Sequence, residues 1–552
     1  MIWFDALRFP SYSVPRDSTQ WPKGSYIRRS FGMDVLWWST EDGGYHMSAN
    51  ELEPYRYVGD LPIDTILSLL RKEQTPLEPT EDLFSWAESA RLMTESDRSP
   101  AQQALVDFIN HYQTLPDWVD VDQLRRGQHV YLKFAPTASL SLYYRSLIPG
   151  FSIPKIAAVV RSTRYLAPPS RPDQVVQRLM DTGGFLMACM SQGVDAILPG
   201  NIGWKMALQV RALHAKVRHA LLLEPGRWKI SQWGVPINQE DLAATLLAFS
   251  VNVLVGIEFV AGVAVSRQDR LDYLALWRYL GWLLGVETVM SPKDFPSPIR
   301  MQRQEQQLKL HPLDPCGPGS SGDPIVHSAS MLQAIIFHIL HPDHTSIEIA
   351  HNLLKISSEK KKPPSDRQRK TRHKVDMDDE DDEFKTDWFY FRSLQCRRFI
   401  GQPLADALQL PYHPIRWKRW RLWIFSTGYL LVLRCYTLAT MYLPTAVGSW
   451  AFRRHRQGMQ TFFQHWTSTH QSNLAQAIAE QQNHQRHVQG QAPLRQTTNS
   501  RNRSGANQDQ DPVSETQHES KMQTATSSLG LLNESGVSVC PFSMVNSPQL
   551  GD

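Results

Sequence analysis

The stretch of sequence that decides the fold is residues 210–249, VRALHAKVRHALLLEPGRWKISQWGVPINQEDLAATLLAF. It joins two segments, 204–223 and 239–263, in which apolar residues recur at helical intervals. Asn238 or Gln239 opens the second segment, and the acidic residues that follow favour a helix start through the helix dipole. The same apolar pattern is found outward of this stretch, in 134–148, 153–166, 172–192 and 269–286. Because no run of alternating strands is convincing, the sequence predicts an all-α core.

Composition divides the 552 residues into five parts. We predict an irregular N-terminal arm over 1–60, a helical domain over 61–355, a disordered charged insertion over 356–384, C-terminal helices over 385–456 and a largely disordered tail over 457–552. The insertion opens basic and closes acidic, so it has little apolar surface to bury. A docking or localisation signal is the alternative function for it, beside that of a solvated loop. The tail is rich in Gln, Asn and Ser.

The most apolar stretch of the chain is 422–447, LWIFSTGYLLVLRCYTLATMYLPTAV. It is long enough to cross a bilayer, but Arg434 lies in its middle, where a charge is costly. Basic residues flank it on both sides, so they indicate no topology. Three interpretations remain open: an interfacial helical hairpin, a spanning helix, and a buried core helix.

Several classes of protein are disfavoured by composition. The formal net charge of +4 is small for this length, and no zinc-finger spacing is present, so we expect no nucleic-acid partner. The five cysteines never form a CxxC pair, which argues against a disulfide framework and a structural zinc site. No secretory signal is evident near residue 1. We therefore expect an intracellular protein, in the cytoplasm or on a cytosol-facing membrane surface.

A polar stripe is the first candidate site. Arg211, His214 and Arg218 are three and then four residues apart, which places them on one face of a helix. Imidazole can ligate a metal, and guanidinium groups fork onto carboxylates. Buried arginines need anionic partners, and these are either protein carboxylates or the propionates of a haem. A core histidine with satisfied nitrogens is the alternative for His214.

A second candidate lies upstream, in QVVQRLMDTGG (174–184). Arg178 and Thr182 are four residues apart, so a helix sets a cation beside a hydroxyl. In a pocket, the pair could orient O₂ or a peroxide through donated hydrogen bonds. An ordinary surface pair with Asp181 nearby is the alternative.

The common enzyme signatures are missing from the sequence. There is no Walker A loop, no GxGxxG after a strand, no GxSxG, no HExxH and no cytochrome P450 cysteine signature. One HxD pair, His341 and Asp343, has the spacing of a facial-triad iron site, but Pro342 between them favours a turn with a capping aspartate.

The chain resembles the family that joins the latex-clearing proteins (rubber oxygenases) to the ER-bound oxygenase of mycophenolic acid biosynthesis. The matching segments follow one another in family order: LPDWVDVDQLRRGQ (115–128), RSLIPGFSIPKIAAVVRSTRYL (145–166), RLMDT (178–182), VRALHAKVRHAL (210–221), WGVPINQEDLAATLLAFS (233–250) and LWRYLGWLLGVE (276–287). The resemblance implies an oxygenase-like catalytic domain with a globin-like helical core, wrapped by additional helices.

The resemblance also implies a b-type haem. His214 matches the family's proximal iron ligand and Arg211 the arginine before it, while Arg178 and Thr182 match the distal pair. The family's upstream lysine and glutamate have no placeable counterpart in this chain. We therefore expect a haem-dependent oxygenase that uses O₂ to cleave a carbon–carbon double bond in an apolar, isoprenoid-type substrate. The expected place is the cytoplasm or the cytosolic face of the endoplasmic reticulum, with 422–447 on the membrane. The alternatives are another oxidative tailoring step in natural-product biosynthesis, and a non-catalytic helical scaffold without the cofactor.

Overall fold

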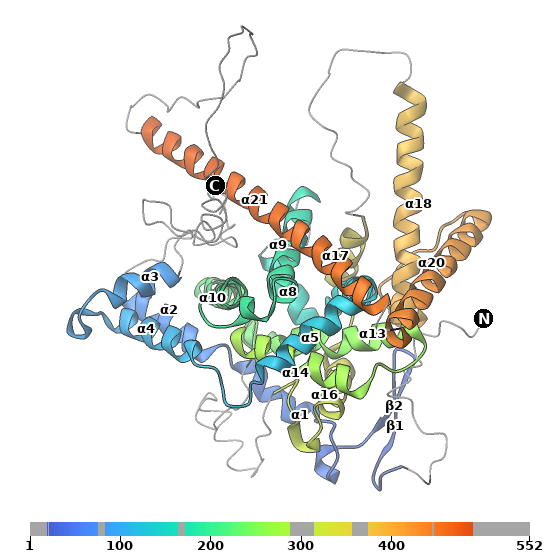
Figure 1. Cartoon of the computed structure of the whole chain (residues 1–552), viewed down its shortest axis with the longest axis horizontal. Helices are drawn as coiled ribbons and strands as arrows, with labels where there is room; N and C mark the ends of the chain where they lie inside the picture. Colours follow the sequence, from blue (N-terminus) through green and yellow to red (C-terminus); the bar gives the residue numbers. More distant parts are fainter. Residues whose placement is uncertain are drawn as a thin grey trace, which may run out of the picture.

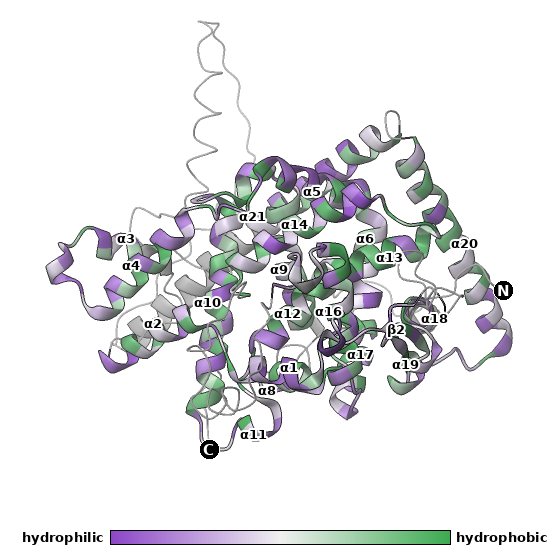
Figure 2. Cartoon of the chain, turned by 90° about the horizontal axis from the view of Figure 1, so that it is seen from below, coloured by the Kyte–Doolittle hydropathy of each residue, from purple (hydrophilic) through white to green (hydrophobic). Residues whose placement is uncertain are grey.

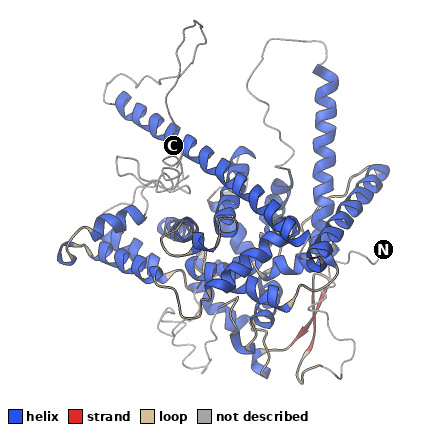
Figure 3. Cartoon of the chain, in the orientation of Figure 1, coloured by secondary structure: helices blue, strands red, loops and turns tan. Residues whose placement is uncertain are grey.

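The computed structural model describes residues 19, 21–74, 83–163, 172–286, 314–355, 374–443 and 447–488. Within these ranges the protein is almost wholly helical (Figure 3), so the predicted all-α class is confirmed. The strands of these ranges form one antiparallel hairpin of β1 (Tyr26–Ser30) and β2 (Met33–Trp37). The N-terminal arm is therefore more regular than the sequence predicted, although residues 1–18 lie outside the description.

The helices pack around a central group that includes α5, α13, α14 and α16 (Figure 1). The first half of the chain contributes α1 (Ala49–Leu52), α2 (Leu61–Lys72), α3 (Leu83–Arg91), α4 (Pro100–Gln113), α5 (Val121–Lys133), α6 (Ala135–Ser141), α7 (Ile148–Gly150), α8 (Pro154–Ser162) and α9 (Pro172–Met190). The middle contributes α10 (Ile202–Leu223), α11 (Ile230–Trp233), α12 (Gln239–Phe249), α13 (Val251–Ala261) and α14 (Arg267–Leu283). The last part contributes α16 (Pro324–Ile339), α17 (His344–Lys355), α18 (Lys374–Ile400), α19 (Gln402–Ala407), α20 (Arg416–Tyr442) and α21 (Ser449–Val488).

One hydrophobic core joins most of these helices. Its buried side chains extend along the chain from Trp37 to Trp466, and every residue of α13 is buried. Burial of a large apolar side chain stabilises a fold by roughly 1.5–3 kcal/mol, so this shared core is the main term that holds the helices together.

The predicted segment 239–263 divides into two helices at Ser250. Asn238 is the N-cap of α12, because its side chain accepts a hydrogen bond from the Asp241 backbone N–H at 3.0 Å. The sequence signal for this helix start is therefore confirmed. Ser250 has φ −101° and ψ −97°, outside helical values, and its hydroxyl donates to the Leu246 carbonyl at 2.8 Å. The chain breaks there because Ser250 offers the preceding helix a side-chain cap.

Two helices extend past the boundaries that the sequence predicted. Helix α18 begins at Lys374, within the expected insertion, and α21 continues to Val488, well into the expected tail. The reason is clearest in α21, where Phe463 and Trp466 are buried in the core. A segment that buries such side chains gains the free energy that a disordered tail lacks. Residues 356–373 and 489–552 lie outside the description.

The apolar stretch near the C-terminus forms one helix, α20, beside α13 and α18 (Figure 1). The hairpin interpretation is therefore wrong for residues 422–442. Two helical stretches in the described chain are long and apolar enough to cross a membrane: Gln239–Ala261, which is mostly buried, and α20, which is mostly exposed. Such length and composition are weak evidence of spanning.

Candidate functional site

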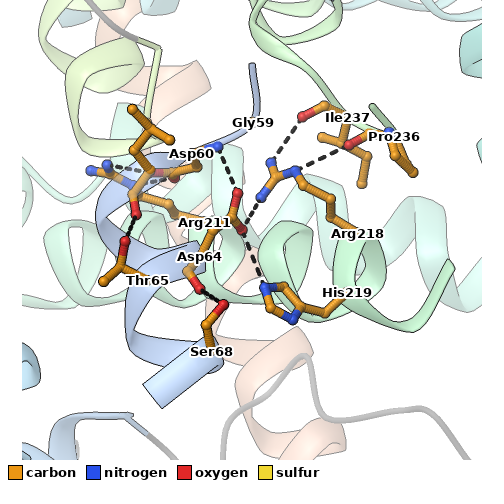
Figure 4. A network of polar contacts seen from close by, with 12 residues as sticks. Gly59, Asp60, Asp64, Thr65, Ser68, Arg211, Arg218, His219, Pro236 and Ile237 are labelled. Carbon is orange, nitrogen blue, oxygen red and sulfur yellow. Dashed lines mark hydrogen bonds and ion pairs between the residues drawn. The ribbon is translucent and has the colours of Figure 1, made fainter. Parts of the chain in front are cut away.

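The predicted stripe lies on the face of α10 that is turned toward the start of α2 (Figure 4). Arg211 is fully buried there, and its Nε and Nη2 donate to the two carboxylate oxygens of Asp60 at 2.6 and 2.7 Å. Its guanidinium also lies 4.6 Å from the ring centroid of Tyr112. Burial alone would lower the pKa of Arg211, but the Asp60 carboxylate raises it, so the guanidinium stays charged.

Arg218 is fixed in a similar way, two helical turns further on. Its Nη1 forms an ion pair with Asp64 at 2.5 Å, while Nε and Nη2 donate to the carbonyls of Pro236 and Ile237 at 3.1 and 2.8 Å (Figure 4). The guanidinium therefore ties α10 both to α2 and to the loop before α12.

These contacts bear on the two alternatives that the sequence left open. The buried arginines were expected to meet either protein carboxylates or haem propionates, and the structure supplies Asp60 and Asp64 as the carboxylates. All three guanidinium nitrogens of Arg218 donate to protein oxygens, whereas Nη1 of Arg211 is buried without a hydrogen-bond partner among the described residues. Asp60 and Asp64 were missed by sequence reasoning. Their i, i+4 spacing at the start of a helix was the available signal, since it presents two anions to one side.

His214 lies between the two arginines on the same face. Burial lowers its pKa to about 4, with a smaller lowering from Arg218, so its imidazole is neutral at pH 7. The Nδ1 atom is buried and has no hydrogen-bond partner in the described structure, while part of the residue's surface stays accessible. The alternative of a core histidine with both nitrogens satisfied is therefore wrong for Nδ1. A neutral imidazole is the form that ligates a metal.

The neighbouring His219 is in a different situation. Its Nε2 lies 3.9 Å from Asp64, on the outer side of the arginine pair (Figure 4). It lies about 140° round the helix from His214, since successive helical residues are about 100° apart. The two histidines thus face different surroundings.

Arg178 and Thr182 lie on α9, whose neighbour is α21. The Thr182 hydroxyl donates to the Arg178 carbonyl at 3.0 Å. Between them, Asp181 is buried and accepts hydrogen bonds from Gln177 Nε2 at 2.9 Å and from Trp466 Nε1 at 3.3 Å. Asp181 is therefore buried rather than on the surface, and its hydrogen bond with Trp466 joins α9 to α21.

The two candidate groups are held by different parts of the fold. In Figure 1, α10 is seen end-on while α9 runs along the picture, so the two helices cross steeply. The two helices approach closely at Gly203 of α10, where an added Cβ would lie 3.3 Å from the carbonyl oxygen of Ala188 in α9. Ala188 is ten residues from Arg178 and Gly203 is eleven from His214. The structure therefore brings the residues of the α10 stripe together on one helix, while Arg178 and Thr182 lie on the neighbouring helix α9.

The described residues form no recognisable site for a metal ion held by protein side chains alone. No group of three or more His, Cys, Asp or Glu side chains there is placed to hold a metal ion. Asp343 of the HxD pair accepts hydrogen bonds from the Ser346 N–H and hydroxyl, both at 2.8 Å, so it caps α17 as expected. A small cavity of about 100 Å³ lies elsewhere, between α5, α14 and the loop before α16.

A buried ionic cluster was also missed by the sequence reasoning. Lys155 at the start of α8 forms ion pairs with Glu240 and with Asp241, the latter at 2.9 Å, and Arg56 pairs with Glu240 at 2.7 Å. Glu240 and Asp241 form the acidic first turn of α12. This turn therefore holds α8 in place through Lys155, in addition to stabilising the start of α12.

Comparison with known proteins indicates which class of protein the chain resembles. Residues 151–312 match the family model described as "ER-bound oxygenase mpaB/B'/Rubber oxygenase, catalytic domain". This helical chain is thus similar, over these residues, to an oxygenase catalytic domain, which confirms the resemblance that the motifs indicated. The match covers less than a third of the chain.

Solved structures add little beyond this. The chain is similar to "Structure of Latex Clearing Protein LCP in the closed state", with 17% sequence identity, a TM-score of 0.43, and coverage of 73% of this chain and 91% of that one. At this level the likeness carries no argument, so the globin-like arrangement of the core remains a prediction. No curated protein matches the chain.

Proposed function

We propose that this protein is a haem-dependent oxygenase with His214 as the ligand of a b-type haem iron. The match of residues 151–312 to an oxygenase catalytic domain supports an oxidoreductase. The observation that carries the haem proposal is His214 itself: a neutral imidazole, held between two fixed arginines, with a buried and unpartnered Nδ1. A haem brings its own ring nitrogens, so it needs few protein ligands, whereas a bare ion would need a cluster that the described residues do not form.

The arginines would then act as supports of the histidine. The Arg211–Asp60 and Arg218–Asp64 pairs clamp α10 onto α2 on either side of His214. Such outer contacts set the orientation of a ligand and keep its surroundings dry. The Arg218 charge also opposes protonation of His214, which keeps the imidazole available.

We assign Arg178 and Thr182 the role of orienting O₂. The haem, when bound, supplies the iron that activates O₂. The Thr182 hydroxyl donates to the helix backbone in this structure, so it must rotate about χ1 before it can donate to a bound molecule. A threonine in a helix has two accessible χ1 rotamers, which makes this a modest step.

The proposed reaction is oxidative cleavage of a carbon–carbon double bond in an apolar, isoprenoid-type substrate. This substrate class comes from the family resemblance, since rubber oxygenases are named in the family description. An apolar substrate partitions into membranes, and we therefore propose the cytosolic face of the endoplasmic reticulum as the place of work.

The haem content of the purified protein tests the proposal. We expect the chain, expressed with a haem precursor, to show a Soret band and near-stoichiometric haem by pyridine haemochrome. His214→Ala should lose most of this haem, while His219→Ala, the matched control one turn along α10, should keep it. Folded wild-type protein without a Soret band, or equal haem in both variants, would contradict the proposal.

The role of Thr182 is tested separately. Thr182→Ala should retain haem but slow O₂-dependent turnover on the order of 10²–10³-fold, the usual cost of one lost positioned hydrogen bond. Steady-state oxygen consumption with a polyisoprene oligomer measures this. An unchanged rate would remove Thr182 from the proposal.

A further inference from the structure

The outer face of α20 is the largest concentration of exposed apolar side chains in the described chain. Of the 23 large hydrophobic residues exposed there, nine lie on this one helix. They are Trp417, Trp420, Trp423, Ile424, Phe425, Tyr429, Leu431, Val432 and Tyr442. Phe425 and Val432 are 72% and 69% exposed, and they are seven residues apart on one face. Figure 2 shows this helix as a largely apolar edge of the molecule. Patches of this kind mark binding surfaces.

The polarity of α20 is the reverse of that in a soluble protein. Besides Lys418, Leu430 and Leu433, its inward face carries three buried hydroxyl residues, Ser426, Thr437 and Thr440. The hydroxyls of Thr437 and Thr137 are hydrogen-bonded at 2.8 Å, which joins α20 to α6. A helix on a soluble protein turns its apolar stripe inward and its polar side chains to water. Helices that face lipid instead place small and hydroxyl residues against their protein neighbours.

The single charge in the apolar part of α20 also faces the protein. Arg434 donates from Nε to the Ala261 carbonyl at 3.0 Å, at the end of α13. Its guanidinium fills the space beside Gly262, which has φ +74° and therefore favours glycine in any case. Arg434, whose charge made membrane contact unfavourable in the sequence analysis, therefore does not interrupt the apolar outer face of α20.

The charge pattern around α20 identifies the partner. Residues 407–479 contain no Asp or Glu, but they contain eight basic residues: Arg416, Lys418, Arg419, Arg421, Arg434, Arg453, Arg454 and Arg456. Asp387 of α18 pairs with Arg421 and lies 3.4 Å from Lys418, so it offsets part of this charge. Of the remaining arginines, Arg416 and Arg419 are exposed beside Trp417 and Trp420 at the start of α20. Arg453 and Arg454 are exposed near the start of α21, which follows α20 along the chain. Tryptophan with basic residues is the composition of helices at the interface of anionic membranes.

From these observations we propose that the outer face of α20 docks the protein on an anionic lipid bilayer, with the helix lying in the plane of the surface. The in-plane orientation follows from packing, because α13, α18 and α6 contact the other side of the helix. A protein partner would need complementary acidic and apolar surfaces, whereas a bilayer with anionic headgroups supplies both along the whole helix. This inference does not depend on the haem proposal.

Vesicle flotation tests the docking. We expect the full-length protein to float with phosphatidylcholine–phosphatidylserine vesicles, more weakly with pure phosphatidylcholine, and less at high salt. The double variant Phe425→Glu/Val432→Glu should lower the partition coefficient on the order of tenfold or more, because two charges then enter the apolar region. Leu92→Glu/Leu223→Glu, which changes exposed residues far from α20, is the matched control and should bind as the wild type does. Far-ultraviolet circular dichroism checks that all three proteins are folded.

Several outcomes would overturn the docking proposal. These are wild-type protein that does not float, a double variant that floats equally well, and membrane-bound protein that resists alkaline carbonate, which would indicate a spanning helix. Wild-type dimers that the double variant dissociates, without vesicle binding, would identify a second copy of the chain as the occupant. Because His214→Ala leaves α20 unchanged, that variant should still float, which separates failure of the haem proposal from failure of this one.

Discussion

At the level of single residues, the Arg211–Asp60 pair is a buried ion pair in which each charge depends on the other. Asp60→Asn would leave the Arg211 guanidinium buried beside a neutral amide. Breaking a buried ion pair by removal of one partner costs about 3–5 kcal/mol, and we expect a loss of that size in the free energy of unfolding by urea. Asp34→Asn, which breaks the exposed Arg29–Asp34 pair, is the control and should change stability little. Equal effects of the two substitutions would show that Asp60 is not a buried counterion.

The protonation of His214 makes stability depend on pH. Its pKa falls from 6.5 to about 4 on folding, so between these values the unfolded chain binds a proton that the folded chain excludes. The contribution of His214 is therefore fully present above about pH 6.5 and is lost as the pH falls toward 4, by about 3 kcal/mol. His214→Gln should remove this part of the pH dependence of urea unfolding, measured on the haem-free protein. Parallel stability curves for wild type and variant would contradict it.

The sequence could predict the stripe but not its partners. The spacing of Arg211, His214 and Arg218 is local, so helical geometry alone places them on one face. Asp60 and Asp64 lie some 150 residues earlier, and which helix packs against α10 is a tertiary outcome that no local pattern encodes. For the same reason the sequence did not indicate that α9 and α10 would cross steeply.

At the level of elements, local signals predicted helices well and their ends less well. The cap at Asn238 and the break near Pro342 were both found from side-chain chemistry and proline geometry. The extension of α21 was not predicted because its composition is polar, whereas its contacts with α9 and α5 give it a reason to be ordered. Tertiary burial overrode composition in that segment.

The α9–α21 contact depends on a residue without a side chain. A Cβ at Gly184 would lie 2.6 Å from the ring of Trp466, so Gly184→Ala must displace that ring. We expect a loss of about 1–3 kcal/mol in unfolding free energy, the usual cost of overpacking. Gly458→Ala, on α21 with nothing within 4 Å, should instead be neutral or stabilise by up to about 1 kcal/mol. Chemical denaturation of both variants measures this, and a stable Gly184→Ala protein would show that α21 does not rest on α9.

At the level of the whole molecule, the core crosses the predicted domain boundaries. The length of the chain and its charged insertion indicated a catalytic domain ending near 355 and separate C-terminal helices from 385. One buried cluster nevertheless contains Cys189 of α9, Cys316 before α16 and Cys396 of α18. Sequence alone could not show this, because a charged segment between two apolar ones fits a linker and an excursion from a single core equally well.

These three cysteines can decide whether the protein unfolds as one unit. Burial raises the pKa of all three thiols, for Cys316 to about 12, so they are protonated as well as inaccessible in the folded chain. In a Cys435→Ser/Cys540→Ser background, which removes the exposed thiol and the one outside the described residues, we expect the native protein to resist pulsed alkylation. As urea rises, the three sites should become reactive together at one midpoint, measured site by site by mass spectrometry, because they share one core. Labelling of Cys396 at lower urea than Cys189 would instead mean that the C-terminal helices unfold first. The domain boundary expected from the sequence would then separate two units that unfold independently, even though they share one packed core.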